Sequence, residues 1–309
     1  MSHDHHGHAH SHGHDHAPGD YGRAFAIGIA LNLVYVAAEA GYGLAAGSLA
    51  LLADAGHNLG DVLGLGLSWG AAMLGRRGPS DRFTYGLRSS SILAALANAV
   101  ILLVVTGGIA WEAIRRLGHP AAVAGGTVAV VAAIGIAVNG ATALLFARGR
   151  GSDLNLRSAF MHMTADALVT AGVVVAGIAI ALTGLLWLDP AVSLVVSAVI
   201  VYGTWDLVRQ SLNLALAAVP RSVDAAAVRK HLLAMPGVAA LHDLHIWGMS
   251  TTETALTCHL VMPQGHPGDA ALSRIAAELA AQFHIHHTTL QIELGDSAEA
   301  CALTPEHIV

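Results

Sequence analysis

Long, nearly uninterrupted apolar stretches occupy the first two thirds of the chain. A helix needs about 20 apolar residues to cross the hydrocarbon core of a bilayer. Six stretches reach that length, at residues 24–45, 49–74, 90–112, 124–147, 158–182 and 190–211. Short polar breaks separate them. The pattern predicts an α-helical membrane bundle of six transmembrane helices over residues 21–219.

The arginines of the breaks predict how this bundle is oriented. Most lie in the second and fourth breaks, at Arg76, Arg77, Arg82, Arg88, Arg148, Arg150 and Arg157. The breaks expected on the other side hold Arg115 and Arg116. Arginine is enriched in cytoplasmic loops. We therefore expect both termini in the cytoplasm, which agrees with an even number of spans.

Beyond Pro220 the chain changes to short elements of mixed polarity. The pattern predicts a helix over Ser222–Met235 with Ser222 as N-cap, strands over Val238–Trp247 and Glu253–Met262, a helix begun by Asp269, and a last strand through Leu290, Ile292 and Leu294. The order αββαβ predicts a small cytoplasmic α+β domain over residues 220–295, with its helices on one face of the sheet. Because so short a domain has a thin core, pairing with a second copy would stabilise it. Residues 296–309 form a C-terminal tail.

The composition narrows the class of function. Hydrophobic residues make up 54% of the 309 residues and charged residues 12%, which disfavours a water-soluble enzyme. The net charge of −6 disfavours nucleic-acid binding, and two cysteines cannot build a disulfide framework. The 20 histidines outnumber the 15 lysines and arginines. Histidine is the commonest metal ligand, so metal chemistry is indicated.

Residues 1–20 form a polar, histidine-rich tail that we expect to be disordered. Its histidines are His3, His5, His6, His8, His10, His12, His14 and His16. Such tracts are typical of metal capture. Glycine, alanine, serine and aspartate interrupt the histidines, which favours a native tract over an expression tag.

Two pairs of ionisable residues lie inside the apolar stretches. His57 and Asp61 are four residues apart in the second stretch, and His162 and Asp166 have the same spacing in the fifth. Residues at this spacing share one face of a helix. Two imidazoles and two carboxylates suit one tetrahedral Zn²⁺ site between the helices, with Cd²⁺ and Co²⁺ as close competitors. The alternative is two interhelical hydrogen bonds without a metal.

The same ligands suggest how transport is driven. Metal binding requires neutral imidazole and ionised carboxylate, so it releases protons. The chain has no Walker A sequence for ATP. Exchange of zinc for protons is therefore the hypothesis. Asp54 and Glu39, also within the apolar stretches, are candidates for a gate or a proton relay.

Three motifs make the chain similar to a known family. SLALLADAGHNLGD in the second stretch, HMTAD in the fifth and HDLHIW in the tail domain resemble the cation diffusion facilitators, over about residues 20–295. The resemblance is to the bacterial zinc-exporter branch, which is also similar to vertebrate vesicular zinc transporters. It implies a homodimer in the bacterial inner membrane, a transport site between the second and fifth helices, and a metallochaperone-like cytoplasmic domain. It also implies Zn²⁺/H⁺ antiport out of the cytoplasm.

The resemblance further implies a metal site in the cytoplasmic domain. The matching positions are His242, His259, Gln291 and Glu293. A neutral amide is a poor zinc ligand, so His245 or His287 could replace Gln291. Strand alternation places His259, Gln291 and Glu293 on exposed sheet faces and His242 among apolar neighbours, which favours a position of His242 at a strand end. A solvated or dimer-facing polar cluster without metal is the alternative. Cys301 and His307 of the tail are further candidates for metal capture.

Two other functions compete with transport. An intramembrane metalloenzyme would need an open coordination position and a general base, and the chain lacks His-Glu-x-x-His. We therefore expect no enzymatic activity. A membrane-anchored zinc sensor or buffer would depend on the histidine-rich tail, and would tolerate Asp166→Ala. The export hypothesis predicts the reverse.

Overall fold

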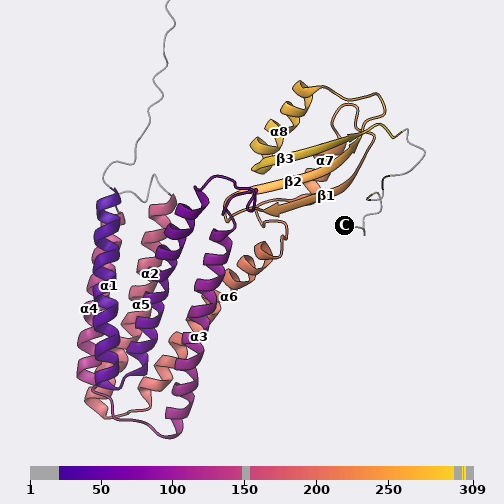
Figure 1. Cartoon of the computed structure of the whole chain (residues 1–309). Coiled ribbons are helices and arrows are strands. Elements are labelled where there is room, and N and C mark those ends of the chain that lie inside the picture. Colours follow the sequence, from indigo (N-terminus) through magenta and orange to yellow (C-terminus); the bar gives the residue numbers. More distant parts are fainter. Residues whose placement is uncertain (1–20, 148–153, 296–300, 302, 304–309) are drawn as a thin grey trace, which may run out of the picture.

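A bundle of long helices and a small α+β domain make up the molecule (Figure 1). The computed structural model describes residues 21–147, 154–295, 301 and 303. The histidine-rich tail and His307 lie outside the described residues. The helices of the bundle are α1 (Tyr21–Ala46), α2 (Leu49–Gly75), α3 (Ser90–Gly118), α4 (Gly125–Ala147), α5 (Leu154–Thr183) and α6 (Leu188–Ala215).

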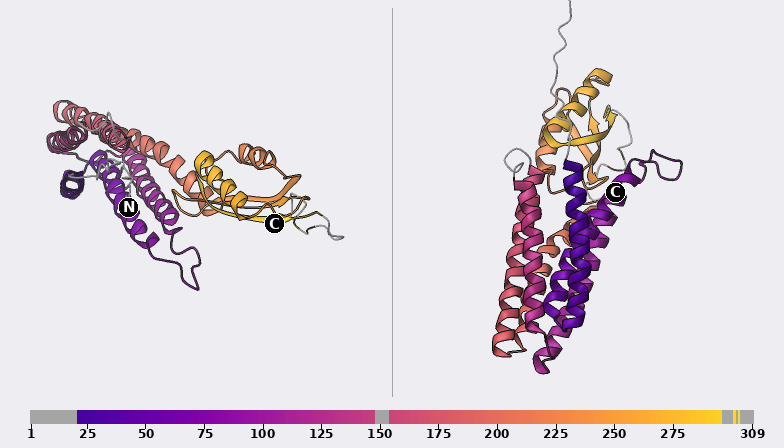
Figure 2. Two further views of the ribbon diagram at one scale, coloured as in Figure 1. Left: turned by 90° about the horizontal axis from the view of Figure 1, so that it is seen from above. Right: turned by 90° about the vertical axis from the view of Figure 1, so that its left-hand side faces the viewer.

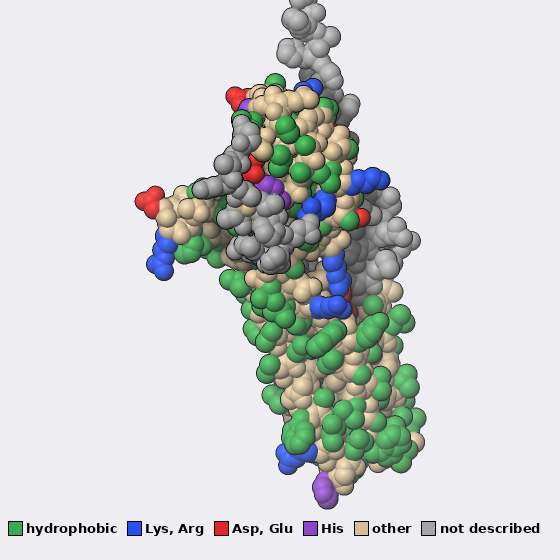
Figure 3. All heavy atoms as spheres, turned by 90° about the vertical axis from the view of Figure 1, so that its right-hand side faces the viewer, with side chains coloured by type: hydrophobic (Ala, Val, Ile, Leu, Met, Phe, Trp, Pro, Cys, Tyr) green, Lys and Arg blue, Asp and Glu red, His purple; other side chains and the backbone are tan. Residues whose placement is uncertain are grey.

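The apolar character of these helices confirms the predicted helical membrane bundle. Within the described residues, four segments are long and apolar enough to cross a bilayer: Ser90–Gly118, Gly125–Leu144, Thr164–Thr183 and Leu188–Ala215. Many of their large apolar side chains face outward, and Leu182 and Tyr202 are more than three-quarters exposed. Figure 3 shows apolar side chains over the visible face of the bundle, with most of the visible basic side chains near the small domain and a few at the opposite end. This surface suits a lipid environment.

The packing of the helices joins α4 to α5 and α3 to α6, with α2 packed against α1, α3 and α6. α3 and α6 lie nearer to the small domain than α1 and α4 do (Figure 1 and Figure 2). The start of α1 and the end of α6 lie at the same end of the bundle. The chain therefore enters and leaves the bundle on one side.

A carboxylate of α6 fixes the start of α2. Asp189 accepts hydrogen bonds from the hydroxyl of Ser48, from the backbone nitrogen of Leu49 at 2.7 Å and from that of Ala50 at 3.4 Å. Its side chain is buried. The first backbone N–H groups of a helix have no partner within the helix, and a negative charge there is favourable. Asp189 thus caps α2 from a different helix.

The small domain has the order α7β1β2α8β3, which confirms the predicted αββαβ fold. Its elements are α7 (Ala225–Leu233), β1 (Ala240–Gly248), β2 (Thr254–Val261), α8 (Asp269–Phe283) and β3 (Ile285–Glu293). β2 is central, antiparallel to β1 and parallel to β3. Side chains of α7 and α8, among them Val228 and Leu279, pack with Leu256 of the sheet in one core. Both helices therefore cover the same face of the sheet.

The N-cap of α7 differs from the prediction. The helix begins at Ala225, and the side chain of Asp224 accepts hydrogen bonds from the backbone nitrogens of Ala226 and Ala227. Ser222, the predicted cap, lies before the helix. Both residue types cap helices well. The actual start of the helix decides between them, and here it favours Asp224.

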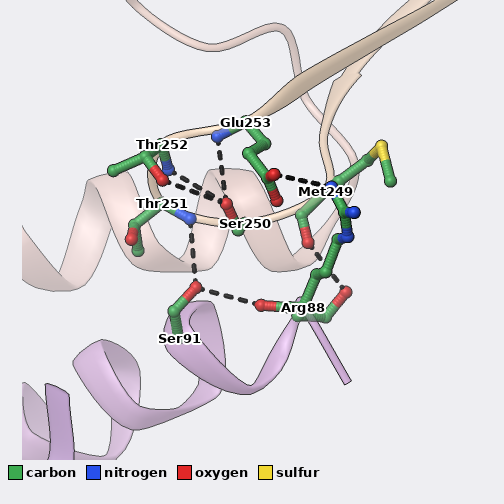
Figure 4. A network of polar contacts seen from close by, with 8 residues as sticks. Arg88, Ser91, Met249, Ser250, Thr251, Thr252 and Glu253 are labelled. Carbon is green, nitrogen blue, oxygen red and sulfur yellow. Dashed lines mark hydrogen bonds and ion pairs between the residues drawn. The ribbon is translucent and has the colours of Figure 1, made fainter. Parts of the chain in front are cut away.

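Polar contacts join the small domain to the bundle (Figure 4). Arg88 forms an ion pair with Glu253 at 2.6 Å, between the segment that leads into α3 and the turn that connects β1 with β2. The Ser89 hydroxyl donates to the Met249 carbonyl at 3.2 Å. The Thr251 backbone nitrogen donates to the Ser91 hydroxyl at 3.1 Å. The start of α3 is thus attached to the β1–β2 turn.

Candidate metal centres

Helices α2 and α5 bring three of the four predicted transport ligands together. The His57 Nε2 atom lies 3.1 Å from Asp166 Oδ1 and 3.9 Å from Asp61 Oδ2. One donor atom from each residue lies within 4.8 Å of the other two. The Asp166 side chain is only 4% exposed, whereas that of Asp61 is 27% exposed. The group is therefore shielded from solvent at Asp166 of α5 and more accessible at Asp61.

His162 is the fourth predicted ligand. It lies on α5 four residues before Asp166. Residues at this spacing point to the same side of a helix. Its side chain lies outside the described residues, so its part in the site stays a prediction.

Asp54 and Glu39 lie next to this group and are fully buried. Thr170, one turn after Asp166 on α5, donates its hydroxyl to Asp54 Oδ2 at 2.9 Å. The Glu39 carboxylate accepts from the Tyr35 hydroxyl at 2.6 Å and from the Asn58 amide at 3.3 Å. Buried carboxylates with hydroxyl and amide partners connect α1, α2 and α5 at the level of the site.

A second group lies on the sheet of the small domain. The His242 Nε2 and His259 Nδ1 atoms are 3.3 Å apart, and they lie 3.3 and 2.9 Å from the two oxygens of Glu293. The Cys301 sulfur is 3.7 Å from His259 Nδ1. Donor atoms of these four residues all lie within 4.8 Å of one another. We call this set the cytoplasmic cluster, after the location predicted for the small domain.

A β-bulge corrects the predicted position of His242. In β1, His242 pairs with His259, but the next paired residue is His245 opposite Thr257, so β1 has one residue more than β2 at this point. Asp243, within the bulge, has a φ of 51°. An extra residue reverses which side chains face the core. Simple alternation placed His242 among apolar neighbours, whereas the bulge turns it toward His259.

The alternation of side chains along the strands did not predict that Cys301 belongs to the cluster. Sequence reasoning considered it only as a tail residue for metal capture, because its distance along the chain gives no signal of the contact. Gln291 is exposed and donates its amide to Glu293 Oε1 at 3.2 Å. Of the suggested replacements, His245 contacts Asp243 and His287 packs edge-on against Tyr85. The structure thus brings Cys301, and neither of those histidines, to the cluster.

The surroundings shift the pKa values of Cys258 and Glu293 in opposite directions. Burial, with the nearby Asp243 carboxylate, raises the pKa of the Cys258 thiol to about 12. For Glu293, partial burial acts to raise the pKa, but the Cys301 hydrogen bond and the His242 and His259 rings outweigh it. The pKa of Glu293 is therefore lower than usual. An ionised carboxylate beside two imidazoles and a thiol is a donor set that suits Zn²⁺.

Comparison with known families assigns both parts of the chain. The family described as the cation efflux transmembrane domain matches residues 25–214. The family described as the cytoplasmic domain of cation efflux proteins matches residues 220–294. The chain belongs to the cation efflux family. This confirms the resemblance to the cation diffusion facilitators, and it makes the chain a multi-pass membrane protein that transports cations.

Several relatives share most of the chain. The metal cation efflux system protein CzcD of Cupriavidus metallidurans is 36% identical over 97% of this chain and 92% of its own length. The zinc transporter ZitB of Escherichia coli is 34% identical over 87% of this chain and 86% of its own. A cadmium, cobalt and zinc/H⁺-K⁺ antiporter of Bacillus velezensis is 33% identical over 84% of each chain. These names are those of transporters, which agrees with the expectation that the chain is not an enzyme.

One solved structure also resembles the small domain in sequence. It is the metal-bound C-terminal domain of the CzcD transporter from C. metallidurans, which is 41% identical, with a TM-score of 0.22, over 23% of this chain and 100% of its own.

Proposed function

We propose that this cation efflux protein exports Zn²⁺ from the cytoplasm in exchange for protons. The transport site would consist of His57, Asp61, His162 and Asp166. The observation that carries the proposal is the convergence of His57, Asp61 and Asp166, from two different helices, inside the membrane bundle. Charged groups in such a position are costly and are kept for function. The relatives named as zinc transporters support the choice of metal.

The donor set explains the selectivity and the exchange. Two imidazole nitrogens and two carboxylate oxygens in a tetrahedral arrangement suit Zn²⁺, and Cd²⁺ and Co²⁺ are the next best cargo. The antiporter of B. velezensis, named for all three metals, supports this range. Since metal and protons compete for the same ligands, a site that opens alternately to the two sides exchanges one for the other.

Glu39 and Asp54 are proposed to relay protons to the transport site. Both are buried, and Asp54 lies one turn before His57 on α2. The Tyr35 and Asn58 hydrogen bonds hold Glu39 toward α2, and Thr170 links Asp54 to α5. A relay predicts that Glu39→Gln slows exchange in both directions while zinc affinity at equilibrium stays unchanged.

The position of the protein in the membrane follows from its arginines. The chain enters and leaves the bundle at one end (Figure 1). α2 returns to that end, and Arg76, Arg77 and Arg88 lie in the segment that connects α2 with α3. The positive-inside rule makes this end cytoplasmic. We propose a homodimer in a bacterial inner membrane, with both termini in the cytoplasm.

The cytoplasmic cluster is proposed to hold a regulatory zinc ion through His242, His259, Glu293 and Cys301. Cys301 supplies the thiolate in place of the Gln291 amide. The histidine-rich tail would raise the local zinc concentration without being required for transport. Since regulation and transport use separate ligands, each site can be removed without removing the other.

Zinc flux in sealed vesicles tests the transport site. Purified protein is reconstituted in liposomes containing a zinc-sensitive dye, and flux is measured with and without an imposed pH gradient. We expect Asp166→Ala to abolish flux. His57→Ala removes a proposed ligand and should also be inactive. His231→Ala is its matched control and should transport, because His231 pairs with Glu278 on the small domain.

The outcomes also separate export from sensing. Deletion of residues 1–18 is expected to reduce flux modestly. Full activity of Asp166→Ala would refute the transport site, and loss of function on deleting the tail alone would favour a sensor. Flux that ignores the pH gradient would refute proton exchange.

A further inference from the structure

Asp243 has an unusual backbone conformation beside the cytoplasmic cluster. It lies in the bulge of β1, between His242 and the next paired residue, His245. Its φ of 51° is in the left-handed region, which residues other than glycine rarely adopt and aspartate tolerates better than most. The same bulge turns His242 toward His259. One local distortion therefore places both a cluster member and the neighbouring carboxylate.

The Asp243 carboxylate contacts the side of His259 that faces away from the cluster. Its Oδ2 atom lies 3.4 Å from His259 Nε2, while Nδ1 of the same ring faces Glu293 at 2.9 Å and Cys301 at 3.7 Å. The Asp243 side chain is 11% exposed. Its other oxygen, Oδ1, lies 2.8 Å from His245 Nε2. The two ring nitrogens of His259 thus have separate partners.

We propose that Asp243 is a positioning residue for the cytoplasmic metal site. With a metal on Nδ1, the Asp243 carboxylate accepts the Nε2–H on the opposite side of the ring and fixes the orientation of His259. Histidine ligands commonly donate their second ring N–H to a carboxylate, which fixes the tautomer and the ring orientation. The proposal rests on the proposed zinc site of the cytoplasmic cluster, and it adds the residue that orients His259 within that site.

Binding of Co²⁺ to the full-length protein tests this role. A thiolate-to-cobalt charge-transfer band reports on the cluster, because the chain has two cysteines and Cys258 is buried in the core of the domain. The histidine-rich tail and the transport site hold no thiol and do not contribute to this band.

Asp243→Gly is the decisive variant. Glycine adopts a φ of 51° without strain, so the apo protein is expected to unfold at the same temperature or a higher one. If Asp243 positions His259, half-saturation of the band needs about 10–100 times more Co²⁺. Asp243→Asn keeps an acceptor oxygen and should give an intermediate value. His245→Ala, the control, removes the other partner of Asp243 and should bind Co²⁺ like the wild type.

The Nε2–H of His259 in the zinc-bound protein gives a second readout. ¹⁵N NMR of the histidine-labelled full-length protein, with the signal assigned by its loss in His259→Gln, should show an Nε2–H that exchanges slowly with water in the wild type. Asp243→Gly should speed this exchange, because the proton loses its carboxylate acceptor. A purely structural role for Asp243 would leave the exchange rate unchanged.

Each outcome has a separate meaning. An unchanged cobalt midpoint in Asp243→Gly, or an Nε2–H of His259 that exchanges equally fast in the variant and the wild type, would overturn the role of Asp243 while the metal site stands. A wild-type protein with no thiolate band would refute the cytoplasmic site, and the role of Asp243 with it. Neither result bears on zinc flux through α2 and α5.

Discussion

Removal of the Asp189 carboxylate should destabilise the bundle through the start of α2. In Asp189→Ala, the Ser48 hydroxyl and the backbone nitrogens of Leu49 and Ala50 lose their acceptor in a buried place. Replacing a capping side chain by alanine costs about 0.5–2 kcal/mol, and a buried donor without a partner costs about 1–3 kcal/mol. Since the stronger backbone bond is 2.7 Å and the weaker is 3.4 Å, we expect a total loss of roughly 2–4 kcal/mol.

The assay is equilibrium unfolding of the purified protein in detergent micelles. Asp206→Ala on the same helix is the control. Its carboxylate is exposed and pairs with Arg221, and exposed ion pairs contribute little to stability. Asp189→Asn keeps one acceptor oxygen and should be intermediate. Because α2 also carries His57 and Asp61, Asp189→Ala should weaken zinc binding as well. An Asp189→Ala protein as stable as Asp206→Ala would refute the capping role.

Three further predictions follow from close contacts elsewhere. Gly135→Ala would place a Cβ atom against the Tyr35 hydroxyl, closer than van der Waals contact allows, so the free energy of unfolding should fall by about 1–3 kcal/mol and zinc flux should slow. Arg88→Ala removes an exposed ion pair to the small domain, so the midpoint temperature of thermal unfolding should hardly change. A large fall in that temperature would show that the ion pair contributes more than an exposed pair is expected to. A maleimide at pH 8 should modify Cys301 and leave Cys258 unmodified, because burial keeps the Cys258 thiol protonated. Added zinc should protect Cys301 from the maleimide. Mass spectrometry that finds Cys258 modified first would contradict this prediction.

The fold class and the family could be predicted from the sequence because local patterns carry them. The length of the apolar stretches indicates membrane helices whatever they pack against. Alternation and helical spacing predicted the αββαβ order of the small domain. The four-residue spacing of His57 with Asp61, and of His162 with Asp166, places each pair on one face of its helix. The number of ligands that one site needs led us to expect that α2 and α5 face each other. The structure agrees, because His57 Nε2 of α2 lies 3.1 Å from Asp166 Oδ1 of α5.

Contacts between distant segments depended on the tertiary structure. An extra residue in β1 reverses strand parity, so alternation alone misplaced His242. Cys301 joins the cytoplasmic cluster from a tail with no regular pattern. The cap of α2 comes from Asp189, about 140 residues further along the chain. The helices and strands, and the residue types available for metal binding, could be predicted from the sequence, because they depend on neighbours along the chain. Which donor atoms meet depends on the folded chain, because a bulge, a tail contact or a cap from another helix leaves no periodic pattern in the sequence.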